Sequence, residues 1–133
     1  MKDIKILLVD DEIDFTKNMS KLLAGRGYQV VTANSGDEAV QALGRGSCDV
    51  MVLDLKMPGK DGLDTLQEIR KLNLVTETIV LTGHGGIDTA MKAMKLGAVD
   101  YLTKPCEVEE IVQKIEEVWK KKTGNGKKKG AAK

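Results

Sequence analysis

The amino-acid sequence predicts an α/β domain: a doubly wound, five-stranded parallel sheet with helices on both faces. Three observations lead to this fold class. Short runs rich in Val, Ile and Leu are apolar at consecutive positions, which is typical of strands covered on both faces. The segments between these runs carry apolar residues at helical spacing. The two kinds of segment alternate strictly, and right-handed crossovers turn such alternation into a parallel sheet.

Five segments have the length and composition of buried strands. They cover residues 4–9, 28–33, 50–55, 78–81 and 98–102. Each is followed by a stripe of apolar residues three or four positions apart, which predicts a helix whose stripe faces the core. These stripes cover residues 15–23, 36–43, 63–69, 87–94 and 108–119. Ser35 and Asp61 stand where helix N-caps are expected.

The composition is that of one ordinary domain. Of the 133 residues, 41% are hydrophobic, which is enough for a core. The apolar runs reach only four residues, whereas a membrane span needs about 20, and the acidic residues 10–12 interrupt any signal peptide. Cys48 and Cys106 are too few for a disulfide framework and lack metal-ligand spacing, so we expect two reduced thiols. We therefore expect a cytoplasmic protein without membrane contacts.

The charge is unevenly distributed along the chain. The net charge is +1, but residues 120–133 hold seven lysines and no acid, which leaves 14 basic and 20 acidic residues in 1–119. This acidic part disfavours nucleic acid binding by the chain alone. We expect the last helix to end near Lys122 and residues 123–133 to form a basic, mostly disordered tail.

Polar residues follow the predicted strands where ligands bind in sheets of this kind. Ligands bind beyond the carboxyl ends of the strands, at the point where the strand order reverses. If the order is 2-1-3-4-5, as in flavodoxin-like folds, the first and third strands end about 4.8 Å apart. The residues that would meet at this edge are Asp10, Asp11, Asp54, Thr82 and Lys104.

This set of side chains suits the handling of a phosphoryl group. Three carboxylates at one edge repel one another unless a positive charge lies among them. Such oxygen-rich sites fit Mg²⁺, which keeps several waters and completes its shell with substrate phosphate. Lys104 adds an ammonium group and Thr82 a hydroxyl group. Together these residues predict a Mg²⁺-dependent phosphoryl site.

Four motifs resemble those of the receiver domain of two-component response regulators. They are Leu7-Leu-Val-Asp-Asp-Glu12, Val52-Leu-Asp-Leu-Lys-Met-Pro-Gly-Lys-Asp-Gly62, Leu81-Thr-Gly-His84 and Asp100-Tyr-Leu-Thr-Lys-Pro105. The resemblance covers residues 4–120 and implies a receiver domain over residues 1–122. Such a domain accepts a phosphoryl group from a sensor histidine kinase or a phosphotransfer protein. A downstream effector protein, or an output domain missing from this chain, would then read the face formed by the fourth helix, fifth strand and fifth helix.

The resemblance also implies chemical roles for single residues. Asp54 would be the phosphoacceptor, and its carboxylate would hold Mg²⁺ together with Asp10, Asp11 and the backbone carbonyl of Lys56. Lys104 would pair with the phosphoryl group.

The remaining implied roles concern the conformational switch. Thr82 would bond a phosphoryl oxygen, and Tyr101 would be the aromatic residue that changes rotamer. Pro105 would follow a cis peptide bond. His84, two residues past Thr82, either edges the pocket or lies in an exposed loop.

Two other functions fit parts of the pattern. A Mg²⁺-dependent phosphohydrolase would use Asp54 as its nucleophile, but it would need an acid/base Asp two residues later, where this chain has Lys56. A flavin-binding module would need a phosphate-cradling loop where residues 10–12 are acidic. The motifs favour a regulatory domain that catalyses at most its own phosphorylation and dephosphorylation. The sequence does not indicate the cognate kinase, the signal, the output pathway or the oligomeric state.

Overall fold

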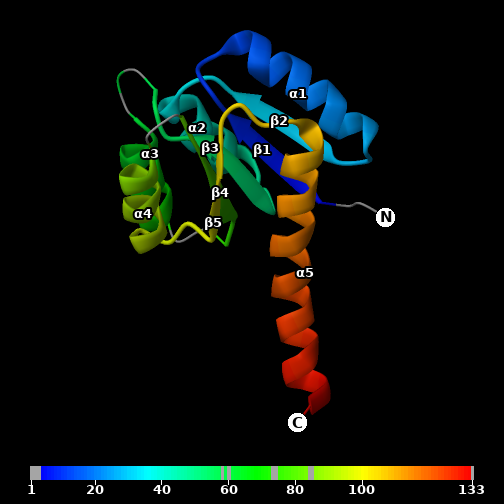
Figure 1. Ribbon diagram of the computed structural model, residues 1–133. Coiled ribbons are helices and arrows are strands. Elements are labelled where there is room, and N and C mark those ends of the chain that lie inside the picture. The colour runs from blue at the N-terminus through cyan, green and yellow to red at the C-terminus, as the bar shows by residue number, and fades with distance from the viewer. Residues whose placement is uncertain (1–3, 58, 60, 73–74, 84–85, 133) are drawn as a thin grey trace.

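A computed structural model describes residues 4–57, 59, 61–72, 75–83 and 86–132, with side chains as far as Lys122 (Figure 1). Within these residues, strands and helices alternate as predicted. The strands are β1 (Lys5–Val9), β2 (Gln29–Ala33), β3 (Val50–Asp54), β4 (Glu77–Thr82) and β5 (Asp100–Thr103). The helices are α1 (Ile13–Gly25), α2 (Gly36–Arg45), α3 (Gly62–Lys71), α4 (Ile87–Lys95) and α5 (Val108–Ala132).

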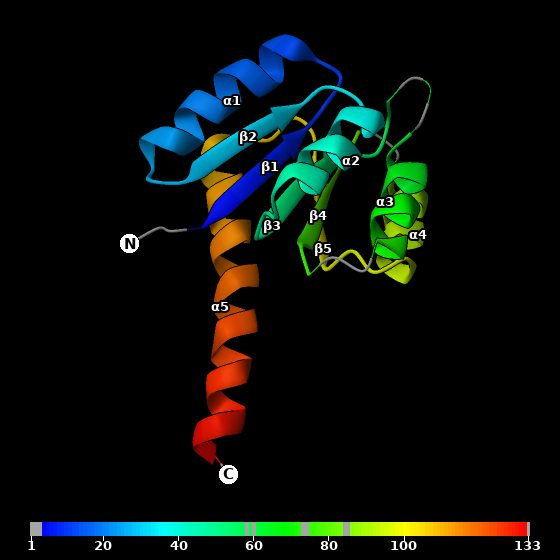
Figure 2. The same cartoon turned by 180° about the vertical axis from the view of Figure 1, so that it is seen from behind.

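The strands form one parallel sheet in the order β2-β1-β3-β4-β5, which confirms the predicted fold class and strand order. Helices α1 and α5 cover one face of this sheet, and α2, α3 and α4 cover the other (Figures 1 and 2). Because β1 and β3 are neighbours, with Val9 paired to Leu53, their carboxyl ends lie side by side. The structure therefore has the sheet edge at which the predicted site residues are expected to meet.

Two apolar layers hold the helices against the sheet. In β1, Ile6 and Leu8 belong to the layer under α1 and α5, whereas Leu7 and Val9 belong to the layer under α2, α3 and α4. All four side chains are fully buried. Burial of such a side chain contributes about 1.5–3 kcal/mol. Helices on both faces thus explain why the strands are apolar at consecutive positions.

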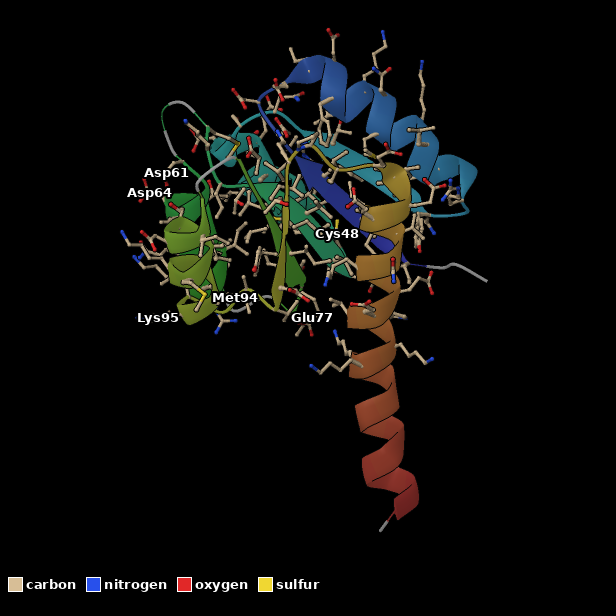
Figure 3. All side chains as sticks on the ribbon, in the orientation of Figure 1. Cys48, Asp61, Asp64, Glu77, Met94 and Lys95 are labelled. Carbon is tan, nitrogen blue, oxygen red and sulfur yellow. The ribbon has the colours of Figure 1, made fainter. Side chains whose placement is uncertain are left out.

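Side-chain caps fix the starts of α2 and α3, and the start of α3 also lies close to the backbone at the end of β3. Ser35 Oγ and Asp61 Oδ1 each accept a backbone N–H bond from the first turn of α2 and α3, which confirms both predicted N-caps. Figure 3 shows Asp61 at the start of α3. A Cβ added at Gly62 would lie 2.4 Å from the Cα of Leu55. Only glycine lets this helix start lie so close to the end of β3.

Helix α5 is longer than the sequence predicts. The predicted end near Lys122 is wrong, because the helix continues to Ala132 and extends away from the sheet (Figure 1). Lysine is a good helix former and no proline interrupts this segment. Each glycine in it costs about 1 kcal/mol of helix stability, which does not force an end. The division into a domain of residues 1–122 and a tail of residues 123–133 stays a prediction.

Two further expectations concern the whole chain. Cys48 and Cys106 are both buried free thiols, as expected. Across the described part of the chain, every helix is too short or too polar to cross a membrane.

Candidate functional site

The side chains that the sequence predicts at one edge of the sheet do meet there. Asp10 directly follows β1, Asp54 ends β3, Thr82 ends β4, and Lys104 follows β5. Lys104 Nζ lies 2.6 Å from Asp10 Oδ2 and 3.9 Å from Asp54 Oδ2. The backbone N–H of Lys104 donates to the carbonyl of Thr82 at 2.7 Å. The parallel register therefore delivers residues from four strands to one site.

Asp10, Asp11 and Asp54 form an acidic cluster whose ligand oxygens all lie within 4.8 Å of one another. Asp10 is fully buried and Asp54 is 4% exposed, whereas Asp11 is accessible to solvent. Asp10 Oδ1 accepts the backbone N–H of Glu12 at 2.9 Å, and Asp54 Oδ1 accepts that of Lys56 at 3.3 Å. Clustered carboxylate oxygens of this kind are the ligands that Mg²⁺ prefers. The cluster thus fits a small divalent cation.

Burial and crowding shift the titration of these groups. Burial raises the pKa of Asp54 to about 6, and the neighbouring charge of Asp10 adds to this effect. Burial also raises the pKa of Asp10, against the hydrogen bond from Lys104. Burial alone would lower the pKa of Lys104, but its hydrogen bond to Asp10 and the charge of Asp54 outweigh this, so that pKa is raised. The ammonium group therefore stays charged beside carboxylates that repel one another.

Lys104 has two neighbours that the sequence did not identify as site residues. Glu12 Oε1 lies 3.2 Å from Nζ, and the centroid of the Phe15 ring lies 4.9 Å from Nζ. A ring at this distance attracts an ammonium group through its negative face. Phe15 begins the apolar stripe of residues 15–23 that predicts its helix, and only its position next to the acidic motif indicates this second contact.

Asn34 is another neighbour that sequence reasoning missed. It directly follows β2, and its side-chain amide donates to the backbone carbonyl of Asp10 at 2.8 Å. An asparagine before a helix-capping serine is common in loops, so nothing in the sequence indicated a contact with Asp10.

Thr82 and Tyr101 lie on the same face of the sheet. Tyr101 pairs with Val80, two residues before Thr82, and successive residues of a strand alternate between faces. Thr82 is 2% exposed, and its hydroxyl has no hydrogen-bond partner among the described residues. Leaving such a group unpaired costs about 1–3 kcal/mol. Tyr101 is half-buried against the apolar layer under α2, α3 and α4.

The remaining predicted site residues have mixed outcomes. The peptide bond between Lys104 and Pro105 is cis, as expected. Lys56 lines the open pocket of about 520 Å³ at the acidic cluster. His84 lies outside the described residues.

A second hollow of about 560 Å³ adjoins the first at Gly83, and Thr82 lines it. The site therefore has space for a phosphoryl group in front of Asp54.

Comparisons with known proteins agree with this geometry. Residues 6–116 match the response regulator receiver domain. The chain is 37% identical over 114 residues to the transcriptional regulatory protein ZraR of Escherichia coli, which covers 86% of this chain and 26% of ZraR. It is 39% identical over 110 residues to the alginate biosynthesis transcriptional regulatory protein AlgB of Pseudomonas aeruginosa, covering 83% of this chain and 24% of AlgB. The chain thus spans about a quarter of the length of these curated relatives.

Solved structures give the same result. A response regulator receiver domain protein from Clostridium thermocellum superposes with a TM-score of 0.83 at 38% identity, covering 90% of this chain and 97% of that one. NtrX from Brucella abortus superposes with a TM-score of 0.86 at 29% identity, covering 93% of this chain and 28% of that one.

Proposed function

The chain belongs to the response regulator receiver domain family, and on this premise we propose that it is a phosphorylation-activated switch with Asp54 as the phosphoacceptor. One observation carries the choice of residue. The Asp54 carboxylate is almost fully buried at the end of β3, yet it lines the open pocket and lies 3.9 Å from the ammonium group of Lys104. A nucleophilic carboxylate needs this combination of a fixed position and open space for in-line attack.

The proposed reaction is transfer from a phosphohistidine. A carboxylate oxygen of Asp54 attacks phosphorus, so that an O–P bond forms while the P–N bond to the imidazole breaks. The electron pair of the broken bond stays on the ring nitrogen, and because the other ring nitrogen of the phosphohistidine already carries a proton, neutral imidazole leaves. Lys104 pairs with the negative phosphoryl oxygens. Because Lys56 occupies the position of the acid/base Asp of phosphohydrolases, we propose no turnover beyond the domain's own phosphorylation and dephosphorylation.

We further propose Mg²⁺ as the cofactor of this site. Asp10, Asp11 and Asp54 would hold it together with the backbone carbonyl of Lys56, and their close spacing supports this ligand set. The bound ion would offset the repulsion between these carboxylates and an incoming phosphoryl group.

The proposed switch uses Thr82 and Tyr101. The buried hydroxyl of Thr82 has no partner among the described residues and would gain one by donating to a phosphoryl oxygen. Movement of Thr82 toward Asp54 would leave a space behind it, on the face of the sheet where Tyr101 lies. Tyr101 would fill this space, so that the packing of α4, β5 and α5 reports the phosphorylation state.

The partners follow from this mechanism. The phosphoryl donor is a sensor histidine kinase or a phosphotransfer protein, and we expect the exchange to take place in the cytoplasm. The reader is a downstream effector protein or an output domain, and the longer relatives named as transcriptional regulatory proteins support the second option. The excess of acidic residues in 1–119 speaks against nucleic acid as a partner of this chain alone.

Mass spectrometry of the intact protein tests the proposal. Incubation with acetyl phosphate and Mg²⁺ should add one phosphoryl group, and removal of Mg²⁺ by a chelator should prevent this. Asp54→Asn should abolish labelling because an amide is a far weaker nucleophile. The control Asp64→Asn changes an exposed carboxylate at the start of α3 and should be labelled like the wild type. Equal labelling of Asp54→Asn would show that another residue is the acceptor.

A further inference from the structure

Asn34 connects two loops that meet beside the acidic cluster. It follows β2, and its half-buried side chain reaches the segment that follows β1. Its Nδ2 donates to the backbone carbonyl of Asp10 at 2.8 Å and to Oγ1 of Thr16 at 2.9 Å. Both N–H groups of the amide therefore have a partner.

The groups around Asn34 are themselves held in place. Thr16 is 2% exposed, and its hydroxyl donates to the carbonyl of Ile13 at 3.0 Å. The backbone N–H of Asn34 donates to Glu38 Oε1, in the first turn of α2, at 2.8 Å. Asn34 is thus tied to α2 through its backbone N–H and to the first turn of α1 through its side-chain amide.

This arrangement acts on the peptide group between Asp10 and Asp11. The carbonyl that Asn34 holds belongs to that planar group, so fixing its oxygen fixes the orientation of the whole plane. The plane in turn fixes the N–Cα bond of Asp11, about which the Asp11 side chain turns. Asp10 itself has a second anchor, because its backbone N–H donates to the carbonyl of Ala33 at 3.1 Å.

We infer that Asn34 is a positioning residue for divalent cation binding: it orients Asp11 by holding the carbonyl of Asp10. The inference rests on the proposed function of the acidic cluster. Of the three carboxylates, Asp11 is the accessible one, so burial constrains it least and a backbone constraint matters most there. An amide suits this role because it offers two donors without adding charge, whereas a carboxylate would offer none.

Calorimetric titration with Mg²⁺ tests the inference without any phosphoryl transfer. Asn34→Ala keeps all the carboxylates but should raise the Mg²⁺ dissociation constant about three- to tenfold, at or below the lower end of the loss expected when a residue that orients a metal ligand is replaced. Asn34→Ser, one heavy atom shorter and still polar, should weaken binding in the same direction. The matched control is Ser35→Ala, which removes the neighbouring cap of α2 and should leave the dissociation constant within about twofold of wild type.

Phosphorylation by acetyl phosphate supplies a second measurement. In Asn34→Ala the Mg²⁺ concentration for half-maximal rate should rise by the same factor as the dissociation constant, while the rate at saturating Mg²⁺ stays within about twofold of wild type. An unchanged dissociation constant in both Asn34 variants, or an equal loss in Ser35→Ala, would overturn the role of Asn34 and leave the proposed function intact. A wild-type protein that neither binds Mg²⁺ nor accepts a phosphoryl group would overturn both.

Discussion

At the scale of single residues, the site concentrates negative charge inside the folded protein. Asp10 and Asp54 are buried next to each other, and Lys104 offsets only part of the cost of burying their charges, since burial raises the pKa of both carboxyl groups. The folded state therefore tolerates an unfavourable arrangement that a bound cation would relieve. This pattern is common where function, and not stability, determines the residues.

Asp54→Asn should stabilise the metal-free protein at neutral pH. Because the pKa of Asp54 is about 6 when folded and 3.8 as its ordinary value, the folded state binds more protons between these values, and stability falls as pH rises through this window. The substitution should therefore raise the free energy of unfolding by about 1–3 kcal/mol at pH 7.5. This gain should fade toward pH 4. Urea denaturation with a chelator at both pH values would reveal it, and a gain that does not depend on pH would contradict the electrostatic explanation.

Residues at strand ends could be predicted from the sequence, whereas the residues that support them could not. Asp10, Asp54 and Thr82 each close an apolar run, so the fold class alone brings them to one edge. Asn34 and Phe15 contact the site through the packing of loops and a helix start, and neither stands in a spacing that indicates such a contact. Secondary-structure pattern determines which strand ends meet, but not which loop side chains reach them.

At the scale of elements, the contact between α3 and the end of β3 positions the segment that holds the proposed phosphoacceptor, Asp54. A Cβ at Gly62 would lie 2.4 Å from the Cα of Leu55 and 2.7 Å from the carbonyl oxygen of Asp54. Both obstacles are backbone atoms, so the strand end or the helix start has to move to admit a side chain.

Gly62→Ala should therefore destabilise the protein by about 1–3 kcal/mol and slow phosphorylation, because it displaces the backbone around Asp54. Gly44→Ala in α2 is the matched control, since a Cβ there meets no atom of the described residues within 4 Å. That change should stabilise the protein by about 0.5–1 kcal/mol, as expected for glycine replaced within a helix. Thermal melting and acetyl phosphate labelling of both variants would separate the two effects. Equal stability of the two variants would mean that the helix start adjusts freely.

The middle of α5 contacts the edge of the sheet opposite the acidic cluster, at the start of β4. Lys122 Nζ lies 3.7 Å from Glu77 Oε2, and it donates to the carbonyl of Val75 at 3.4 Å. Figure 3 labels Glu77 at this edge, beside α5. The sequence predicts too early an end for α5 because its glycines suggest a break. Helix propensity weighs each residue separately, whereas an established helix continues at a lower cost than a new one forms.

Deletion of residues 124–133 should leave folding and phosphorylation intact. The anchoring contacts of Lys122 remain, and surface changes usually alter stability by no more than about 0.5 kcal/mol, so the melting temperature should shift by at most about 2 °C. Differential scanning calorimetry and labelling by acetyl phosphate would measure both. A larger shift would show that the deleted segment stabilises the domain.

At the scale of the whole molecule, the acidic cluster and the proposed switch residues lie on different strands of the sheet. The acidic cluster lies at the carboxyl ends of β1 and β3, whereas the proposed switch residues lie on β4 and β5. In the proposed switch, the effect of phosphorylation therefore has to pass from β3 through β4 to β5, strands that are paired in this order.

Amide NMR shifts should locate this path. Addition of beryllofluoride as a phosphoryl mimic together with Mg²⁺ should produce chemical shift changes concentrated between residues 82 and 110, apart from those at the acidic cluster itself. Asp54→Asn under the same conditions serves as the control and should show none of these changes. Shifts centred on α2 instead would indicate that a different element responds.

The length of α5 gives the molecule a lever arm. Its earlier turns are held against the sheet by the buried Ile111, Ile115 and Val118 and by the contacts of Lys122, and the ten residues after Lys122, as far as Ala132, extend about 15 Å at the helical rise of 1.5 Å per residue. A tilt of about 10° at Lys122 would displace Ala132 by about 3 Å. A repacking of α5 against the sheet that is too small to alter the fold would thus move Ala132 by roughly the length of a side chain.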